Sequence, residues 1–461
     1  MVGGEEVIPL SIIGVLGFGT VVLLAVVLLN GYAWWRLVRS TTRPGRTRRL
    51  LTVVLVLLAL LPVGAVLLRR QDSALGTVVQ WVGFSWLGVV FYLFLTLLAL
   101  EPVRWVAGRL LPGAASPTTE TGVEEVVPSG GRRPPRGDDA AARRDGGTAP
   151  GRDTGSGSTA DATAPGRGAV RQDGDGHGAV PDASRRLFLA RGLAATAGAV
   201  ALGTAGTGAW FANSAPVVRR VPVTLPGLAP ALDGLRIVTF SDGHLSAMSS
   251  TRRFERLVEL VNEQQPDVVA IVGDLVDGEL SELREEVAPL ADLVSRQGVY
   301  FVTGNHEYFV DTTAWLRHLP TLGVEVLRNE RVPIRRGGAY VDLAGIDDRT
   351  AIGSGVPGHG ADLDTALDGR DDAVPVVLLA HQPVQVEQAA AAGVGLQLSG
   401  HTHGGQLWPF DYAVLLDQPV VQGLSRVGDT QLYVTTGAGS WGPPMRIGAR
   451  PEVAVVELRA P

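Results

Sequence analysis

The chain has 461 residues, and 46% of them are hydrophobic. Its formal net charge is −6 at pH 7, and it contains no cysteine. This length accommodates two or three domains, and the lack of cysteine excludes disulfides and thiolate metal sites. Acidic residues outnumber arginines in the second half of the chain. No nucleic acid is therefore expected as a stable partner, because phosphate backbones are bound through clustered cations.

Three long uncharged runs predict transmembrane helices, at Leu10–Asn30, Leu50–Leu68 and Ser73–Leu100. Each is close to the ~20 apolar residues that cross a bilayer. The loop between the first two runs is rich in arginine, and the segment before the first run has none. The positive-inside rule then places this loop in the cytoplasm and the N-terminus outside. A buried helical hairpin in a soluble domain is the alternative, and a transport role is disfavoured because the runs carry no interior charge.

A segment rich in Gly, Pro, Ala, Thr, Asp and Arg follows and predicts a disordered linker. It ends at Arg185-Arg186, and the Ala/Gly-rich run Gly192–Val218 comes next. This pattern resembles a twin-arginine signal, whose partner would be the export machinery; a plain fourth transmembrane helix is the alternative. We therefore expect a multi-pass cell-membrane protein with an extracytoplasmic domain. The expected divisions are 1–111 (three spans), 112–184 (linker), 185–216 (signal or fourth span) and 217–461 (globular domain).

Beyond residue 217, short apolar runs alternate with helical spacing, which predicts an α/β domain with a mixed sheet or two packed sheets. A helix is expected at Arg252–Gln264, with one apolar face. The expected strands are Arg236–Ser241, Val268–Val272, Val299–Thr303, Ala339–Ala344, Val374–Ala380, Leu396–Ser399, Gln431–Thr436 and Val453–Leu458.

Five of the eight histidines lie at the end of a predicted strand or just after it, the edge at which open α/β sheets place their sites. Asp242 and His244 are two apart, so in an extended segment both would point the same way and could share a cation. Asp274 follows the second of these strands, and Asn305 and His306 follow the third. The other three histidines are His381, His401 and His403.

Taken in order, these residues resemble the signature of the calcineurin-like metallophosphoesterases. The matching motifs are Asp242-x-His244, Gly273-Asp274-x-x-Asp277, Gly304-Asn305-His306-Glu307, His381 and Gly400-His401-Thr402-His403. The resemblance covers about Leu235 to Pro461. The sequences at Gly400–Phe410 and Trp441–Glu452 are similar to the bacterial membrane-associated YkuE-like branch of the family.

The resemblance implies a four-layer sandwich, two β-sheets flanked by helices, with two divalent metals at the sheet edge. It implies that Asp242, His244, Asp274 and His403 bind one metal. The second would be bound by Asp274, which bridges, and by Asn305, His381 and His401. His306 corresponds to the general acid or a phosphate-contacting histidine. Oxygen and imidazole ligands suit Mn, Fe or Zn without separating them.

The roles of three further residues stay open at this point. Asp277 and Glu307 could orient metal ligands or could be solvated. Arg446 could approach a phosphate.

The expected function is a membrane-anchored, metal-dependent phosphoric ester hydrolase acting on a phosphomonoester or phosphodiester through metal-activated water. An envelope or lipid-linked substrate is favoured by the anchor. A UDP-2,3-diacylglucosamine-type pyrophosphate hydrolase is the narrower alternative. A catalytically silent, metal-binding membrane sensor is the alternative of another class, and the complete ligand set argues against it.

Overall fold

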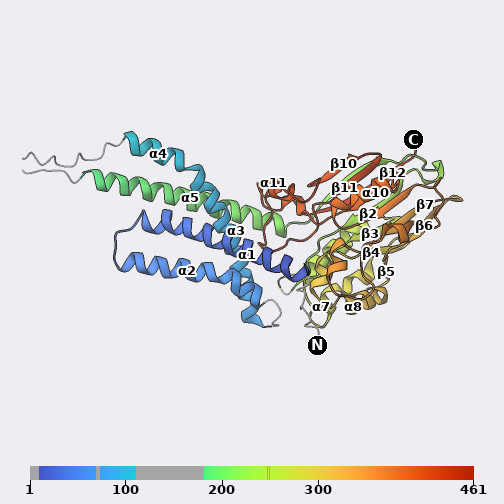
Figure 1. The fold of residues 1–461 in the computed structure, drawn as a ribbon, viewed down its shortest axis with the longest axis horizontal. Coiled ribbons are helices and arrows are strands. Elements are labelled where there is room, and N and C mark those ends of the chain that lie inside the picture. Colours follow the sequence, from blue (N-terminus) through green and yellow to red (C-terminus); the bar gives the residue numbers. More distant parts are fainter. Residues whose placement is uncertain (1–9, 69–72, 111–180, 247, 249) are drawn as a thin grey trace, which may run out of the picture.

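In a computed structural model of the protein, long helices form a bundle beside a globular α/β domain (Figure 1). The structure describes residues 10–68, 73–110, 181–246, 248 and 250–461. Of the linker expected at 112–184, residues 112–180 lie outside the described residues, and the last four begin a helix.

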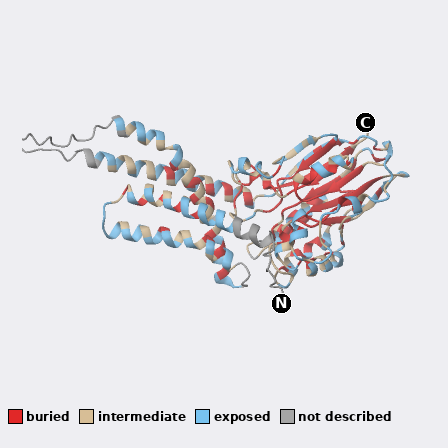
Figure 2. Ribbon diagram, viewed as in Figure 1, coloured by how far each residue is buried: buried red, intermediate tan, exposed pale blue. Residues whose placement is uncertain are grey.

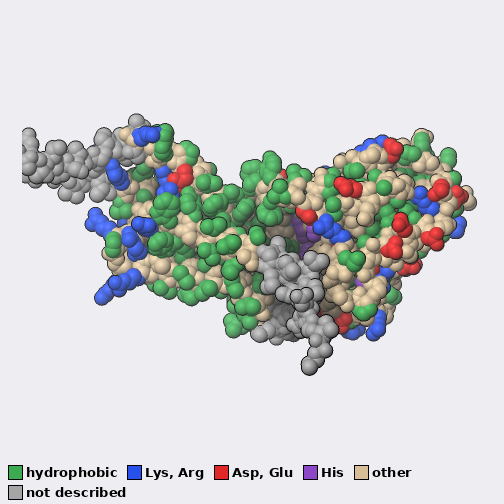
Figure 3. Space-filling model, in the orientation of Figure 1, with side chains coloured by type: hydrophobic (Ala, Val, Ile, Leu, Met, Phe, Trp, Pro, Cys, Tyr) green, Lys and Arg blue, Asp and Glu red, His purple; other side chains and the backbone are tan. Residues whose placement is uncertain are grey.

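Helices occupy the apolar runs of the N-terminal region. They are α1 (Leu10–Ala33), a π-helical continuation (Trp34–Arg39), α2 (Arg46–Leu67), α3 (Ala74–Ala99), α4 (Glu101–Leu110) and α5 (Pro181–Asn213). Four stretches are long and apolar enough to cross a membrane: Gly19–Arg39, Arg46–Leu67, Ala74–Ala107 and Arg185–Asn213. Many of their large apolar side chains face outward, and arginines gather at the end remote from the globular domain (Figures 2 and 3).

The helices of the bundle contact one another through small and paired polar residues. A Cβ on Gly83 of α3 would lie 2.7 Å from the Leu61 carbonyl oxygen of α2, so the two backbones touch there. Near the remote end, Glu101 accepts hydrogen bonds from Arg36 and from the Tyr32 hydroxyl, each at 2.5 Å. The charges that border the apolar runs are therefore partly paired with one another.

The globular domain contains two six-stranded mixed sheets. The first has the order β1-β12-β2-β3-β4-β5, with β1 (Val217–Thr224), β12 (Glu452–Arg459), β2 (Leu235–Phe240), β3 (Val268–Val272), β4 (Val299–Val302) and β5 (Val324–Val326). The second has the order β10-β11-β9-β8-β7-β6, with β10 (Gly423–Val427), β11 (Thr430–Val434), β9 (Leu396–Ser399), β8 (Val376–Leu379), β7 (Ala339–Gly345) and β6 (Glu330–Arg336).

Helices and turns connect the strands. The helices are α6 (Thr251–Glu263), α7 (Leu280–Val287), α8 (Thr312–His318), α9 (Leu363–Leu367), α10 (Val386–Ala391) and α11 (Asp411–Val414). Short 3₁₀ turns cover Pro230–Leu232, Ala288–Asp292, His306–Phe309, Leu319–Leu322, Arg349–Gly353, Pro383–Gln385 and His403–Gly405.

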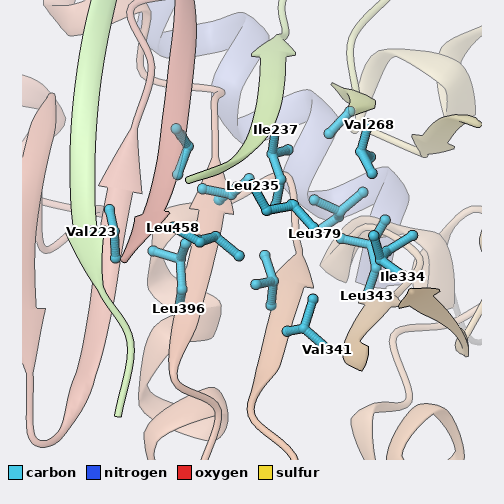
Figure 4. Packing of buried hydrophobic residues seen from close by; sticks show 14 of the residues in the cluster. Val223, Leu235, Ile237, Val268, Ile334, Val341, Leu343, Leu379, Leu396 and Leu458 are labelled. Atoms are coloured by element: carbon cyan, nitrogen blue, oxygen red, sulfur yellow. The ribbon is translucent and has the colours of Figure 1, made fainter. Parts of the chain in front are cut away.

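The main core lies between the two sheets, as Figure 4 shows. Leu235 and Ile237 of the first sheet pack in one cluster with Leu343 and Leu379 of the second. A second cluster joins the outer face of the first sheet to α6, whose buried residues are Phe254, Leu257, Val258 and Val261. A third covers the second sheet with residues of α9 and α10. The expected four-layer sandwich is confirmed.

The structure contains four strands that the sequence pattern does not predict: β1, β5, β6 and β10. Each is an edge strand of its sheet. An edge strand is hydrogen-bonded to only one neighbouring strand and needs no continuous apolar run. Residues 217 and 218, expected at the end of the fourth apolar run, instead begin β1, because α5 ends at Asn213. The eight expected strands are all present, with ends shifted by at most two residues.

Replacing Gly83 by alanine should destabilise the protein by about 1–3 kcal/mol, because the added methyl group would overlap the α2 backbone. The thermal unfolding midpoint of the detergent-solubilised full-length protein measures this effect. Gly203→Ala in α5 is the matched control, since a Cβ at this position would meet no heavy atom within 4 Å. Equal midpoints for both variants would contradict the close packing of α2 on α3.

Candidate metal centre

The loops that follow five parallel strands converge at one edge of the sandwich. Asp242 and His244 follow β2, Asp274 follows β3, Asn305 and His306 follow β4, His381 follows β8, and His401 and His403 follow β9. Figure 3 shows histidine side chains in the hollow where the globular domain meets the helices. The structure therefore brings the expected site residues of both sheets to one place.

The first group consists of Asp242, His244 and His403, whose possible ligand atoms all lie within 4.8 Å of one another. The Nε2 atoms of His244 and His403 are 2.9 Å apart. His403 Nε2 is 3.4 Å from Asp242 Oδ1. All three residues are buried. Two imidazoles and a carboxylate at these distances are a ligand set for a divalent transition metal.

The second group consists of Asp274, His381 and His401, also within 4.8 Å. The rings of His381 and His401 are 5.2 Å apart, and His381 Nε2 is 3.1 Å from Asp274 Oδ2. Asn305 directly precedes His306, whose backbone N–H donates to Asp274 Oδ1 at 2.8 Å. Asp274 also belongs to a third, overlapping group with His244 and His306. Its carboxylate therefore lies between the two groups.

Two buried polar atoms, one in the second group and one in Asn305, are suited to bind a cation. Asn305 Oδ1 has no hydrogen-bond partner among the described residues, and His381 Nε2 has only the Asp274 carboxylate beside it, at 3.1 Å. His381 Nδ1 donates to the Val272 carbonyl oxygen, 2.8 Å away, so a metal that displaces the second ring proton would meet the lone pair of Nε2. An unpaired buried acceptor such as Asn305 Oδ1 costs free energy, and a metal ion bound to it would remove that cost.

The site's electrostatics also favour a cation. Burial would raise the pKa of Asp274, but His381, His306 and His244 outweigh it and hold the pKa well below the usual range. Burial would lower the pKa of His381, but Asp274, Asp242 and Asp348 raise it well above normal. In the metal-free chain, a proton on His381 therefore balances the buried carboxylates, a role that a divalent cation would take over.

The two histidines of the Gly400–His403 motif are neutral. Burial, together with His381, lowers the pKa of His401 to about 3. Burial and the guanidinium of Arg446 lower the pKa of His403 well below its usual value. Neutral imidazoles keep the lone pair that metal binding requires.

The backbone at the site is left-handed at five of the expected ligands. The φ angles are 53° at Asp242, 45° at His244, 51° at Asp274, 70° at His401 and 52° at His403. Asp242 and His244 do lie in one ligand group, but the expected reason is wrong, because their backbone is left-handed and not extended. Such conformations cost about 1–3 kcal/mol each and persist where the surroundings impose them. Here hydrogen bonds such as Asp242 N–H to the Gly273 carbonyl, 3.0 Å, hold the loops.

Two motif glycines are needed because neighbouring atoms leave no room for a side chain. A Cβ on Gly304 would overlap the side chain and the backbone nitrogen of Asp274, and a Cβ on Gly400 would overlap Ser241 and Asp242. Glycine at these positions therefore lets the loops approach the carboxylates closely.

Asp277 is not solvated; its carboxylate joins two histidines. Asp277 Oδ1 lies 3.0 Å from His244 Nδ1 and 2.6 Å from His306 Nδ1. Burial would lower the pKa of His306, but Asp274 and Asp277 raise it to about 9. His306 is thus protonated at neutral pH in the metal-free chain, and its Nε2 faces the site, 4.0 Å from Asp274 Oδ2.

Glu307 is also buried, and it links two of the loops. Its carboxylate accepts hydrogen bonds from the backbone N–H groups of Asp274 (3.0 Å), Leu275 (2.8 Å) and Val276 (3.3 Å) after β3 and of Gly304 (2.6 Å) after β4. Burial and Asp274 raise its pKa to about 7, although the backbone donors oppose the rise. Glu307 therefore fixes the loop that carries Asp274.

The expectation that Arg446 could approach a phosphate is wrong. Its side chain is 0% exposed. It donates to the carbonyl oxygens of His403 (2.8 Å), Thr436 (2.7 Å) and Gly439 (3.0 Å), and Nη2 lies 3.0 Å from His403 Nδ1. Arg446 therefore holds the His403 loop in place and presents no free donor to a substrate.

Two aromatic residues that the motif does not include flank His306. The rings of Phe309 and Trp441 lie 5.2 Å and 5.8 Å from the His306 ring, both at steep angles. Both side chains are exposed, at 44%. No local pattern predicts this, since Trp441 reaches the site from a loop far away in the sequence.

Known proteins resemble this chain over the region that carries the site. A sequence model of the calcineurin-like phosphoesterase family matches residues 235–405. A transmembrane protein with a metallophosphoesterase domain from Bos taurus is 41% identical and covers 60% of this chain. The metallophosphoesterase YkuE from Bacillus subtilis is 31% identical, covering 60% of this chain and 98% of that protein. One from Aquifex aeolicus is 33% identical, covering 49% and 85%.

The similarity does not extend over the full length of every relative. The chain spans 64% of the length of the Bos taurus protein and 57% of that of its Danio rerio counterpart, which is 42% identical.

Replacing Glu307 by glutamine should lower the affinity for a divalent metal by about 10- to 100-fold, because the amide NH2 that replaces one carboxylate oxygen cannot accept from the two backbone N–H groups bonded to that oxygen. Metal competition with a coloured chelator, using the full-length protein in detergent, measures the affinity. Glu325→Gln, at an exposed position of β5, is the control. Unchanged affinity in Glu307→Gln would show that this carboxylate does not set the ligand geometry.

Proposed function

The chain belongs to the calcineurin-like metallophosphoesterase family, and on this premise we propose that it is a membrane-anchored, two-metal phosphoesterase. It would hydrolyse a phosphomonoester or phosphodiester, with an envelope or lipid-linked substrate favoured. The observation that carries the proposal is the placement of Asp274 between two groups of ligands, in which every residue except His401 is buried.

Each residue would have a distinct task. Asp242, His244 and His403 would hold one metal ion, and Asn305, His381 and His401 the other, with Asp274 shared. Mn, Fe or Zn bound there would activate a water molecule and neutralise charge on the phosphoryl group. The protein would contribute the fixed positions of these ligands, which the loops and their left-handed backbone define.

His306 would protonate the leaving oxygen. Its Nε2 faces the site, and Asp277 fixes the ring through Nδ1 at 2.6 Å. A positioned, protonated imidazole is suited to general acid catalysis. Phe309 and Trp441 flank the ring and would limit the access of water to it.

The arrangement of the helices supports an extracytoplasmic catalytic domain. The arginines between α1 and α2 lie at the end of the bundle remote from the globular domain (Figure 3). If this end is cytoplasmic, the C-terminal end of α5 delivers the domain outside. Arg185 and Arg186 lie near the start of α5, which suits either a fourth span or a twin-arginine signal read by the export machinery.

His306→Ala should slow hydrolysis of an alkyl or phenyl phosphodiester by about 10²- to 10⁴-fold, because the leaving oxygen then lacks its proton donor. With bis(4-nitrophenyl) phosphate the loss should be much smaller, because nitrophenolate leaves without protonation. Turnover of both esters by the manganese-loaded full-length protein measures this contrast. His318→Ala is the control, since its ring contacts Arg284 and Thr321 away from the site.

Equal losses on both esters would contradict the role of His306 as an acid. No metal-dependent cleavage of either ester by the wild-type protein, with metal bound, would favour the silent sensor over the hydrolase.

The chain's lack of cysteine makes its topology directly measurable. Val294→Cys in the globular domain should react with a membrane-impermeant maleimide on intact cells, because the domain is proposed to be outside. Thr47→Cys, in the first turn of α2 beside the arginine-rich loop, should react only after the cells are permeabilised. Both positions are exposed. The reverse labelling pattern would place the domain in the cytoplasm.

A further inference from the structure

An exposed apolar surface lies beside the candidate metal centre. It comprises residues 407–416, which include α11, and Trp441; we refer to it as the aromatic surface. Its exposed side chains are Trp408 (55%), Phe410 (54%), Tyr412 (66%), Leu415 (50%), Leu416 (90%) and Trp441 (44%). Contiguous apolar side chains of this size on a folded domain mark an interaction site.

The aromatic surface is anchored on the helices proposed to span the membrane. Leu407 packs on a cluster that contains Val90 and Leu93 of α3 and Ala201 of α5. The hydroxyl of Tyr92 in α3 donates to the Trp408 carbonyl oxygen at 3.0 Å. The surface therefore begins where the globular domain touches the bundle, and it continues the bundle's apolar exterior (Figure 3).

A second set of contacts also fixes the position of this surface relative to the helices. The backbone N–H of Arg446 donates to the Gly208 carbonyl of α5 at 2.9 Å, and that of Trp408 donates to the Ile447 carbonyl at 2.8 Å. Met445 packs so closely on Gly88 of α3 that a Cβ at that glycine would overlap its sulfur. The loop from Met445 to Ile447 thus joins α3 and α5 to the segment that carries Trp408.

The aromatic surface also reaches the proposed general acid. The Gln406 side chain donates to the Trp441 carbonyl at 2.8 Å and accepts from its N–H at 3.0 Å. The Trp441 ring lies 5.8 Å from the His306 ring. Apolar side chains therefore extend from the bundle to the edge of the site, on the side of the leaving group.

We propose that the aromatic surface is embedded in the outer interface of the bilayer, so that the site takes lipid phosphate esters directly from that leaflet. This rests on the proposed membrane anchoring and hydrolase activity. Tryptophan and tyrosine prefer the headgroup level, where an apolar ring and a polar edge are both satisfied. Trp210, 65% exposed near the end of α5, would lie in the same belt. The phosphate would reach the metal centre while the apolar part of the lipid stays in the leaflet beside Phe309 and Trp441.

Nitroxide quenching in a reconstituted bilayer tests the location. Leu416→Cys and Val294→Cys, each made in the otherwise cysteine-free full-length chain, are labelled with the same environment-sensitive fluorophore. The labelled proteins are reconstituted into phosphatidylcholine–phosphatidylglycerol vesicles containing doxyl-labelled lipids. The probe at 416 should be quenched strongly and the probe at 294, at the opposite edge of the first sheet, should not. If the probe at 416 is not quenched, because water, a partner protein or a second copy of the chain covers this surface in place of lipid, the proposal is overturned.

Hydrolysis provides the second readout. With Phe410→Ser and Leu416→Ser together, the rate on a vesicle-embedded phosphatidyl ester, relative to that on bis(4-nitrophenyl) phosphate, should fall by about tenfold, the equivalent of ~1.4 kcal/mol in binding. Val294→Ser should leave this ratio unchanged. An unchanged ratio in the double variant would contradict lipid delivery through this surface. A wild-type protein that cleaves neither ester would refute the proposed hydrolase, whereas quenching at 416 would still decide the location of the surface.

Discussion

The Asp274 carboxylate is the group on which the rest of the site depends. It is buried where loops of both sheets meet, 3.1 Å from His381 of the second sheet and within 4 Å of His244 and His306 of the first. A carboxylate in such surroundings is stable only with compensating positive charge. His381 and His306, whose pKa values are raised, provide it in the metal-free chain, and the same arrangement suits two divalent cations that share one oxygen ligand.

Around this centre, a second layer of residues fixes the ligands. Glu307 binds four backbone N–H groups of the loops after β3 and β4, and Asp277 joins His244 to His306. The Arg446 side chain donates a hydrogen bond to the His403 carbonyl oxygen, and the Arg446 backbone N–H donates to a carbonyl oxygen of α5. The helices proposed to anchor the protein are thus connected through one buried arginine to a proposed metal ligand. Membrane attachment and site geometry depend on the same short loop.

The sequence predicts the parts of this arrangement that are local. Apolar strands β2, β3, β4, β8 and β9 are recognisable because they are buried on both faces, and polar residues directly after them mark the site edge. The edge strands β1, β5, β6 and β10 lack that pattern. The left-handed backbone at Asp242 and the burial of Arg446 depend on contacts with segments distant in the sequence. The approach of Trp441 to His306 is invisible in the sequence for the same reason.

The most direct test of the shared-carboxylate account is the number of metal ions bound per chain. Full-length protein would be purified in detergent, loaded with manganese, passed through a desalting column and analysed by inductively coupled plasma mass spectrometry. The account predicts two ions in the wild-type protein and fewer than one in Asp274→Asn, since both sites lose a charged ligand. A wild-type protein that binds at most one ion, or an Asp274→Asn variant that keeps two, would contradict it.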